Sequence, residues 1–533
     1  MSALGRASVL LGAGTLVSRI TGLIRSIVLV SVIGSTHSRV ADAFGLANQL
    51  PNNIYAVISA GVLTAVIVPQ IVRESARADG GRRFLSALFT AGTVVLLAAT
   101  LVATLCAPLL ISLFGDGFSP EQKALATAFA YWCLPQLFFY GLYALLGEAL
   151  NARRVFGPFT WAPVVNNVIS IAGFVALMLV FGSDLTLVSQ WTPGMIAALG
   201  GTATAGIVIQ AVVLLLFWRR TRLDIRPDFH WRGLGFRNMA QLAGWTTLMV
   251  IVGQIAGLVQ TRLVTNASGE GASVFVMQNA WLVFMLPYSV IVLSIGTPYF
   301  TQLSEHAAAG RTEEVRADIL QSIRLIGLFI VAAAVALAVA AVPASRVFAN
   351  STEAALASAP VLLAYLVGLV PLAVMFIIQR TFYAYDDTRT PFLFTLLQGA
   401  LVIGTALLAA AVLPLEWLAA GIALGQSLAS LVQLIVATLL LSRRLGGLHT
   451  GQWMLSLLRF VAAAIPAGAA GWLLYLLMGG DEGWMVADKI YGALGTAVIG
   501  AVTAAVYLGM LALLRAPELA PAIALGRRIL VRR

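Results

Sequence analysis

The chain has 533 residues, of which 60% are hydrophobic and only 10% charged, and its mean hydropathy is +0.93. This composition excludes a soluble globular protein and is typical of a polytopic membrane protein, in which a net charge of +11 does not indicate nucleic-acid binding. Only two of its 33 basic residues are lysines, Lys123 and Lys489, and neither precedes Ser or Thr, which excludes a Walker A site and transport powered by ATP hydrolysis within the chain.

The first apolar run, 7–34, contains Arg19 and Arg25 but no acidic residue. An arginine at the centre of a membrane span costs about 2.5–3.5 kcal/mol on insertion scales. The run therefore predicts that both arginines face a hydrated cavity that receives an anion. The alternative is snorkelling to the interface. Snorkelling is harder for Arg19, which lies roughly 18 Å from the start of the run, than for Arg25.

A polar segment around Pro51 interrupts the second span, 43–71. Proline removes a helical hydrogen bond, so neighbouring amides either repair the kink or bind a ligand. We predict the second role for Asn48, Gln49 and Asn52, and structural repair is the alternative.

Acidic residues are scarce inside the spans. Asp42 heads the second span, where it is expected to cap the helix and complement its dipole. A role as a gate residue that pairs with a cation is the alternative. Glu148 lies near the inner end of a span, and no acid lies at mid-depth. This pattern disfavours an antiporter of cationic drugs, which generally needs a carboxylate as its exchange site.

Runs of about 20 apolar residues predict fourteen membrane-spanning helices. Basic residues gather at alternate breaks, while the intervening breaks hold only Arg39, Lys123, Arg346 and Lys489. The positive-inside rule therefore places both termini in the cytoplasm, which agrees with an even number of spans. The predicted spans lie near 7–34, 43–71, 85–113, 124–149, 159–181, 196–217, 239–264, 273–299, 319–342, 356–379, 391–413, 417–441, 455–478 and 490–514.

Two similar turns suggest an internal repeat. Asn151–Phe159 joins spans four and five, and Tyr383–Phe392 joins spans ten and eleven, each ending in Pro-Phe at the start of a helix. The predicted fold is all-α, with two six-helix lobes around a central cavity plus two C-terminal helices, an arrangement that favours alternating access. The predicted parts are an N-terminal lobe with a basic connector at 1–238, a C-terminal lobe at 239–444, and two helices with a basic tail at 445–533.

Metal and cofactor sites are not expected. Cys106 and Cys133 lack metal-ligand spacing, and the four histidines form no HxxxH or HExxH pair. The sequence therefore predicts a transporter without covalent chemistry.

The sequence also contains the motifs Thr15–Arg25, Ala41–Phe44, Gln49–Asn52, Val68–Pro69, the two repeated turns and Leu293–Thr297. Together these motifs resemble the MurJ (MviN) family of bacterial lipid II flippases. The lysine-poor, arginine-rich composition further suggests an actinobacterial type of member.

The resemblance implies a member of the multidrug/oligosaccharidyl-lipid/polysaccharide exporter superfamily in the bacterial cytoplasmic membrane. Such a protein moves lipid II, the undecaprenyl-pyrophosphate-linked disaccharide-pentapeptide, to the outer leaflet. Arg19 and Arg25 match the family's cavity arginines, Ser18 lies in the same motif as a substrate-binding candidate, and Asp42 matches its acidic residue at span two. Membrane lipids and proteins of cell-wall synthesis or division are the other expected partners; nucleic acid is not.

The chain also departs from the family pattern. Tyr55 and Ala56 replace a basic pair, Ala60 replaces a glutamate, and span eight is apolar where Arg and Glu are usual. Arg262 is a speculative cavity residue that compensates for these losses, with snorkelling as its alternative. Coupling to the membrane potential or to a monovalent ion is left open.

The sequence is compatible with three alternative functions. The first is translocation of lipid II by alternating access, with the pyrophosphate held by the cavity arginines. The second is export of another polyprenyl-linked oligosaccharide, or drug antiport, on the same scaffold. The third is a transport-inactive membrane scaffold for cell-wall synthesis.

Overall fold

The computed structural model describes residues 3–62, 82–153, 155, 157–221, 226–229 and 236–519. Within these ranges the chain is helical and contains no β-strand, which confirms the all-α class. Thirteen helical segments of the described chain are long and apolar enough to cross a membrane, so the polytopic class is also confirmed. The second predicted span corresponds to α2 (Arg39–Val62), which continues through Pro51 and is less hydropathic because of the polar residues around it.

The chain divides into two compact units, Met1–Gly269 and Glu270–Arg533. The sequence repeat predicts a boundary between the lobes at residue 238. This boundary lies one helix before the boundary between the two units. That helix, α10 (Phe236–Val264), packs against α2 and belongs to the first unit. The repeat and the lobes derived from it stay predictions.

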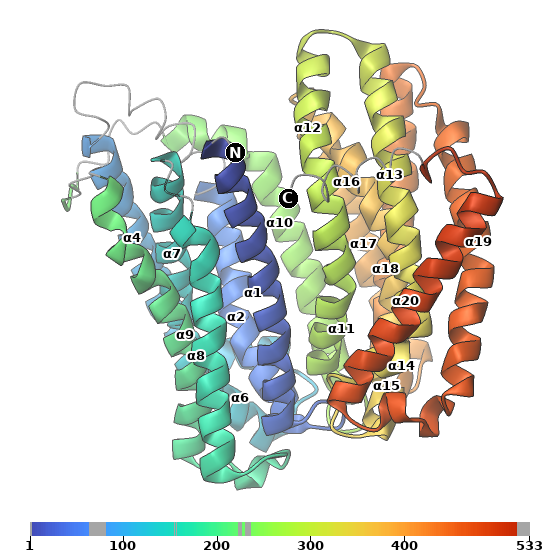
Figure 1. The fold of residues 1–533 in the computed structure, drawn as a ribbon. Coiled ribbons are helices and arrows are strands. Elements are labelled where there is room, and N and C mark those ends of the chain that lie inside the picture. Colours follow the sequence, from blue (N-terminus) through green and yellow to red (C-terminus); the bar gives the residue numbers. More distant parts are fainter. Residues whose placement is uncertain are drawn as a thin grey trace. The chain divides into compact units, whose positions relative to one another are not determined.

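In the first unit α8 (Gly157–Phe181) lies between α1 (Ala3–Ile33) and α9 (Pro193–Leu216) (Figure 1). Glycine allows the close approach of α8 and α9, because a Cβ at Gly206 would lie 2.2 Å from the Oδ1 atom of Asn166. α2 packs against α6, and α4 packs against α7. The other elements of this unit are α4 (Arg82–Leu105), α5 (Ala107–Phe114), α6 (Pro120–Cys133), α7 (Gln136–Ala152), η1 (Val188–Gln190), η2 (Trp218–Thr221) and η3 (Thr265–Ala267).

In the second unit α13 (Thr312–Val339) packs against α12, α16, α19 and α20, and α18 (Leu415–Leu445) packs against α15, α16 and α17. The remaining bounds are α11 (Val274–Pro287), η4 (Tyr288–Val292), α12 (Leu293–Ala308), α14 (Ala341–Arg346), α15 (Thr352–Leu366), α16 (Leu369–Ala384), α17 (Arg389–Val412), α19 (Thr450–Leu477), η5 (Gly480–Glu482), η6 (Trp484–Val486) and α20 (Lys489–Leu513).

Several predicted spans, among them spans four, eight and ten, are each built from more than one helical segment. Span four breaks at Pro135 between α6 and α7, and span ten breaks at Gly368 between α15 and α16. A Cβ at Gly368 would lie 2.8 Å from Ser427 Oγ on α18, so glycine permits the close packing at that break. Span eight contains the π-helical turn η4, which follows Pro287.

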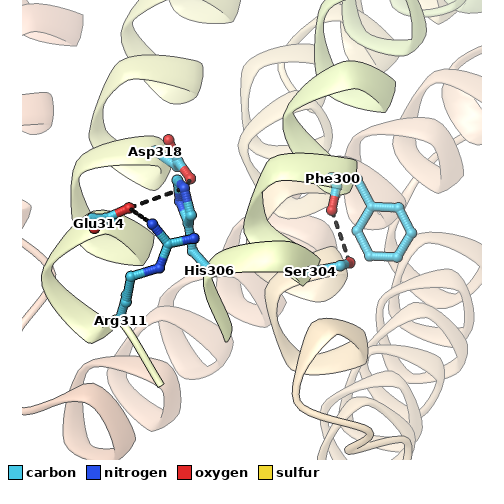
Figure 2. Close-up of polar contacts among 6 residues, drawn as sticks. All are labelled: Phe300, Ser304, His306, Arg311, Glu314 and Asp318. Carbon is cyan, nitrogen blue, oxygen red and sulfur yellow. Dashed lines mark hydrogen bonds and ion pairs between the residues drawn. The ribbon is translucent and has the colours of Figure 1, made fainter. Parts of the chain in front are cut away.

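Charged side chains hold the α12–α13 hairpin together (Figure 2). The Nδ1 atom of His306 lies 2.7 Å from Asp318 Oδ2, and its Nε2 atom lies 3.0 Å from Glu314 Oε2. Arg311 donates from Nη1 to the same Glu314 oxygen over 2.8 Å. The histidine therefore joins the end of α12 to the first turns of α13.

Candidate functional site

The two predicted cavity arginines lie on α1 in the first unit. Arg19 is exposed and Arg25 is half-buried. Among the residues that the structure describes, neither arginine forms an ion pair with a carboxylate. Their predicted role as an anion-binding pair stays a prediction.

α8 holds the helix turn next to Arg19 in place. Asn167 donates from Nδ2 to the backbone oxygen of Ser18 over 3.1 Å and to Thr21 Oγ1 over 3.0 Å. Ser18 thus takes part in this contact through its backbone, and the hydrogen bonds orient the stretch of α1 that carries Arg19.

A chain of polar side chains near Arg25 reaches α2. Tyr140 on α7 lies within electrostatic range of Arg25, and its hydroxyl donates to Gln136 Oε1 over 3.4 Å. Gln136, only 1% exposed, donates from Nε2 to Asn48 Oδ1 and to Thr204 Oγ1, each over 3.1 Å. The structure therefore joins Tyr140, Gln136 and Asn48 in one hydrogen-bonded network, and Tyr140 is its member near Arg25.

The other predicted residues of α2 lie around this network in different environments. Gln49 is half-buried and has polar partners of its own, whereas Asn52 is exposed and Pro51 is buried between them. Of the three amides predicted to bind substrate, only Asn48 is linked directly to Gln136.

Asp42 lies at the opposite end of α2 and is 2% exposed. Ser268 donates from Oγ to Asp42 Oδ2 over 2.6 Å, and Gln122 Nε2 donates to Ser268 Oγ over 2.8 Å. The expectation that Asp42 caps the helix is corrected, because Ser38 Oγ accepts the hydrogen bond from Ala41 N at the helix start. Asp42 instead lies in the first turn, where its charge complements the helix dipole.

Arg262 lies near the end of α10 and pairs with Asp116, with 2.9 Å between Nη2 and Oδ2. The two side chains are 48% and 52% exposed. This pair therefore places the Arg262 guanidinium beside the loop of the first unit that carries Asp116.

Sequence reasoning missed Gln136, Tyr140, Asn167 and Ser268. Gln136 follows Pro135, and Asn167 belongs to an Asn-Asn pair within an apolar span, so polar interruptions were available as signals. Ser268 gave no such signal, because it lies in a polar loop. In the described part of the chain, no group of three His, Cys, Asp or Glu side chains is arranged to hold a metal ion.

A family model and curated relatives all match the chain to the same family. The family model described as lipid II flippase MurJ matches residues 29–489, a range that begins just after the two arginines of α1. A probable lipid II flippase MurJ of Rhizobium tropici is 26% identical over 87% of this chain and 85% of its own length. One from Synechocystis sp. is 24% identical over 95% of this chain and 93% of its own length.

Solved structures share the fold. A lipid II flippase MurJ in an inward closed conformation superposes with a TM-score of 0.72, at 20% identity, over 94% of this chain and 98% of that one. An inward-facing multidrug resistance MATE family transporter of the MOP superfamily gives a TM-score of 0.65, at 18% identity, over 83% of this chain and 99% of that one.

Proposed function

The chain belongs to the MurJ family of lipid II flippases, and on that premise we propose that it moves lipid II by binding the substrate's pyrophosphate at Arg19 and Arg25. Family membership makes it a multi-pass membrane transporter rather than an enzyme, and lipid II is its substrate. The roles of individual residues, the orientation and the coupling are the proposed parts.

One observation carries the proposal. Two arginines lie on a long apolar helix, and neither forms an ion pair with any residue in the described ranges. Keeping such charges within a membrane is costly unless an anion or water accompanies them. A pyrophosphate is a multivalent anion, and the planar guanidinium group binds phosphate oxygens through two parallel hydrogen bonds.

The neighbouring polar network supports this assignment. Tyr140, Gln136 and Asn48 supply hydroxyl and amide groups beside Arg25, and Gln136 is anchored by Thr204. Such groups are suited to orient a hydrated headgroup next to the cation. The polyprenyl tail stays in the lipid while the headgroup crosses.

The Asp42–Ser268 hydrogen bond is the proposed gate element. It ties the loop after η3, which follows α10, to the start of α2 within the first unit. We propose that this link holds when the predicted outer side is closed and that it breaks when α10 moves. Alternating access then needs only a change at one buried hydrogen bond and its neighbours.

Charge supports the direction of transport. The pattern of basic breaks places both termini in the cytoplasm. The interior of a bacterial cell is electrically negative, so outward movement of an anionic headgroup gains about 2.3 kcal/mol per charge per 100 mV. We propose the membrane potential as the coupling energy, with no bound cofactor.

The decisive experiment measures lipid II at the outer leaflet after acute depletion of the native protein. Cells that express Arg19→Ala or Arg25→Ala are expected to accumulate lipid II on the inner leaflet, whereas Arg25→Lys restores part of the activity. Arg262→Ala is the matched control, because its charge is already paired with Asp116. Normal exposure of lipid II in both alanine variants would refute the assignment and favour a transport-inactive scaffold.

A further inference from the structure

A further arginine, which has no ion-pair partner in the described part of the chain, lies in the second unit. Arg380 is on α16, and its guanidinium carbon is 5.0 Å from the centroid of the Phe300 ring and 5.1 Å from that of Phe376. The side chain is half-buried, and it forms no ion pair with a residue of the described chain. Its charge is stabilised by aromatic rings instead of by a carboxylate.

Local backbone features bring these rings together. A Cβ at Gly296 would lie 2.4 Å from Phe376 Cε1, so glycine at this position of α12 lets the ring approach. Tyr288 begins the π-helical turn η4 and packs edge-on against Phe376, with 6.5 Å between ring centroids. π-helical turns inside α-helices occur frequently at functional sites. Span eight therefore shapes the surroundings of Arg380 through its backbone geometry, although it carries no charged residue.

Two tyrosines lie near the guanidinium. Tyr288 and Tyr383 are both within electrostatic range of Arg380. Gln379 donates from Nε2 to the Tyr383 hydroxyl oxygen over 2.9 Å. An anion at this site would therefore meet a cation with polar side chains close by.

The chemistry of an arginine packed against aromatic rings indicates what it binds. Both rings lie within about 5 Å of the guanidinium carbon, and an arginine that stacks on a ring face still has N–H groups along the edges of its plane for hydrogen bonding. Those edges match the two oxygens of a carboxylate or phosphate. The rings also hold the long side chain in one conformation, which lowers the entropy cost of binding.

We infer that Arg380 binds one phosphate or carboxylate group of the translocated headgroup, an inference that rests on the proposed function. The pyrophosphate and the carboxylates of the pentapeptide are the two sources of such a group. Arg380 then supplies in the second unit a cation that span eight lacks, since Leu282 and Met285 are apolar.

The test uses the full-length protein in lipid nanodiscs and measures binding of lipid II and of undecaprenyl pyrophosphate by microscale thermophoresis. Arg380→Ala and Arg380→Gln are compared with Arg389→Ala, which removes an exposed arginine at the start of α17. Loss of a bidentate hydrogen bond to a charged group is expected to weaken lipid II binding at least about tenfold. Arg389→Ala is expected to bind like the wild type.

The two ligands distinguish the sources of the anion. Weakening for both ligands assigns Arg380 to the pyrophosphate, and weakening for lipid II alone assigns it to a peptide carboxylate. Unchanged affinity of folded Arg380→Gln for both ligands overturns the inference. A wild-type protein that binds neither ligand would instead refute the proposed function. If Arg380→Ala lowers the thermal unfolding midpoint, the affinities of Arg380→Gln are used to test the inference, because glutamine keeps a long polar side chain without the charge.

Discussion

Ser268 donates a hydrogen bond to the buried carboxylate of Asp42 over 2.6 Å, although 226 residues separate them in the sequence. The same hydroxyl accepts a hydrogen bond from Gln122, whose Nε2 atom also donates to the backbone oxygen of Arg39 over 2.8 Å. One small side chain in the loop after η3 therefore connects to both α2 and α6 within the first unit. A buried hydroxyl that both donates and accepts is expensive to replace.

Ser268→Ala is expected to lower the free energy of unfolding by about 1–3 kcal/mol, because Asp42 loses a donor and Gln122 loses an acceptor. Transport of lipid II is expected to fall as well, since the gate loses its closed-state contact. Thermal unfolding of the purified protein and the outer-leaflet assay measure the two effects. Ser112→Ala is the control, because the exposed Ser112 donates within its own helix α5, to Leu109 O. Equal stability of the two variants would contradict the proposed gate contact.

Gln136→Leu tests the network beside Arg25. Leucine fills a similar volume but removes the hydrogen bonds to Asn48 and Thr204, and each bond contributes about 0.5–1.5 kcal/mol. We expect lower stability and at least a tenfold weaker affinity for lipid II, measured in nanodiscs. Gln398→Leu is the matched control, since its amide makes only a 3.5 Å contact with Ser430. Wild-type affinity in Gln136→Leu would show that the network does not orient the substrate.

Gly206→Ala tests the packing of α8 against α9. The added methyl group would lie 2.2 Å from Asn166 Oδ1 and 2.9 Å from Ser170 Oγ, so the helices must separate. Overpacking of this kind costs about 1–3 kcal/mol, which a lower unfolding midpoint would reveal. Gly500→Ala on α20 adds a methyl group with nothing within 4 Å. Its unfolding midpoint is expected to stay the same or rise, because alanine favours a helix over glycine.

Arg262→Ala is expected to change stability by less than about 1 kcal/mol, because the pair with Asp116 is half exposed and screened by solvent. Lipid II transport is expected to remain close to the wild-type rate. A severe loss of transport with normal folding would instead place Arg262 among the substrate-binding residues.

Asp387 makes the turn before α17 sensitive to acid. Burial raises the pKa of its carboxyl group, but hydrogen bonds from Thr390 and the charge of Arg444 outweigh burial and lower this pKa overall. Because the pKa is lowered in the folded state, the stabilising contribution is complete above about pH 4 and is lost as the pH falls through the lowered value.

Thermal unfolding midpoints measured between pH 7 and pH 3 check whether stability falls on acidification as predicted. The wild type is expected to lose more stability on acidification than Asp387→Asn, which has no carboxylate to protonate. Asp386→Asn, at the neighbouring exposed position, is expected to follow the wild type. A wild type whose midpoint rises on acidification relative to Asp387→Asn would contradict the prediction.

The broad architecture was predictable because a membrane imposes a local requirement on sequence. Each span needs about 20 apolar residues, so the runs and their polar breaks are readable without knowledge of packing. The breaks inside spans four and eight also have local causes in Pro135 and Pro287. The conspicuous charges of Arg19 and Arg25 were readable for the same reason, since lipid penalises them wherever the helices lie.

Tertiary structure decided which polar residues meet. Gln136 reaches Asn48 across 88 residues, and Ser268 reaches Asp42 across 226, so no local pattern contains either pair. It also decided that Ser38 caps α2, that Arg262 pairs with Asp116, and that Arg380 packs against Phe300. Hydropathy is a property of each segment by itself, whereas hydrogen bonds and cation–π contacts depend on distances of a few ångströms that only the packing of helices sets.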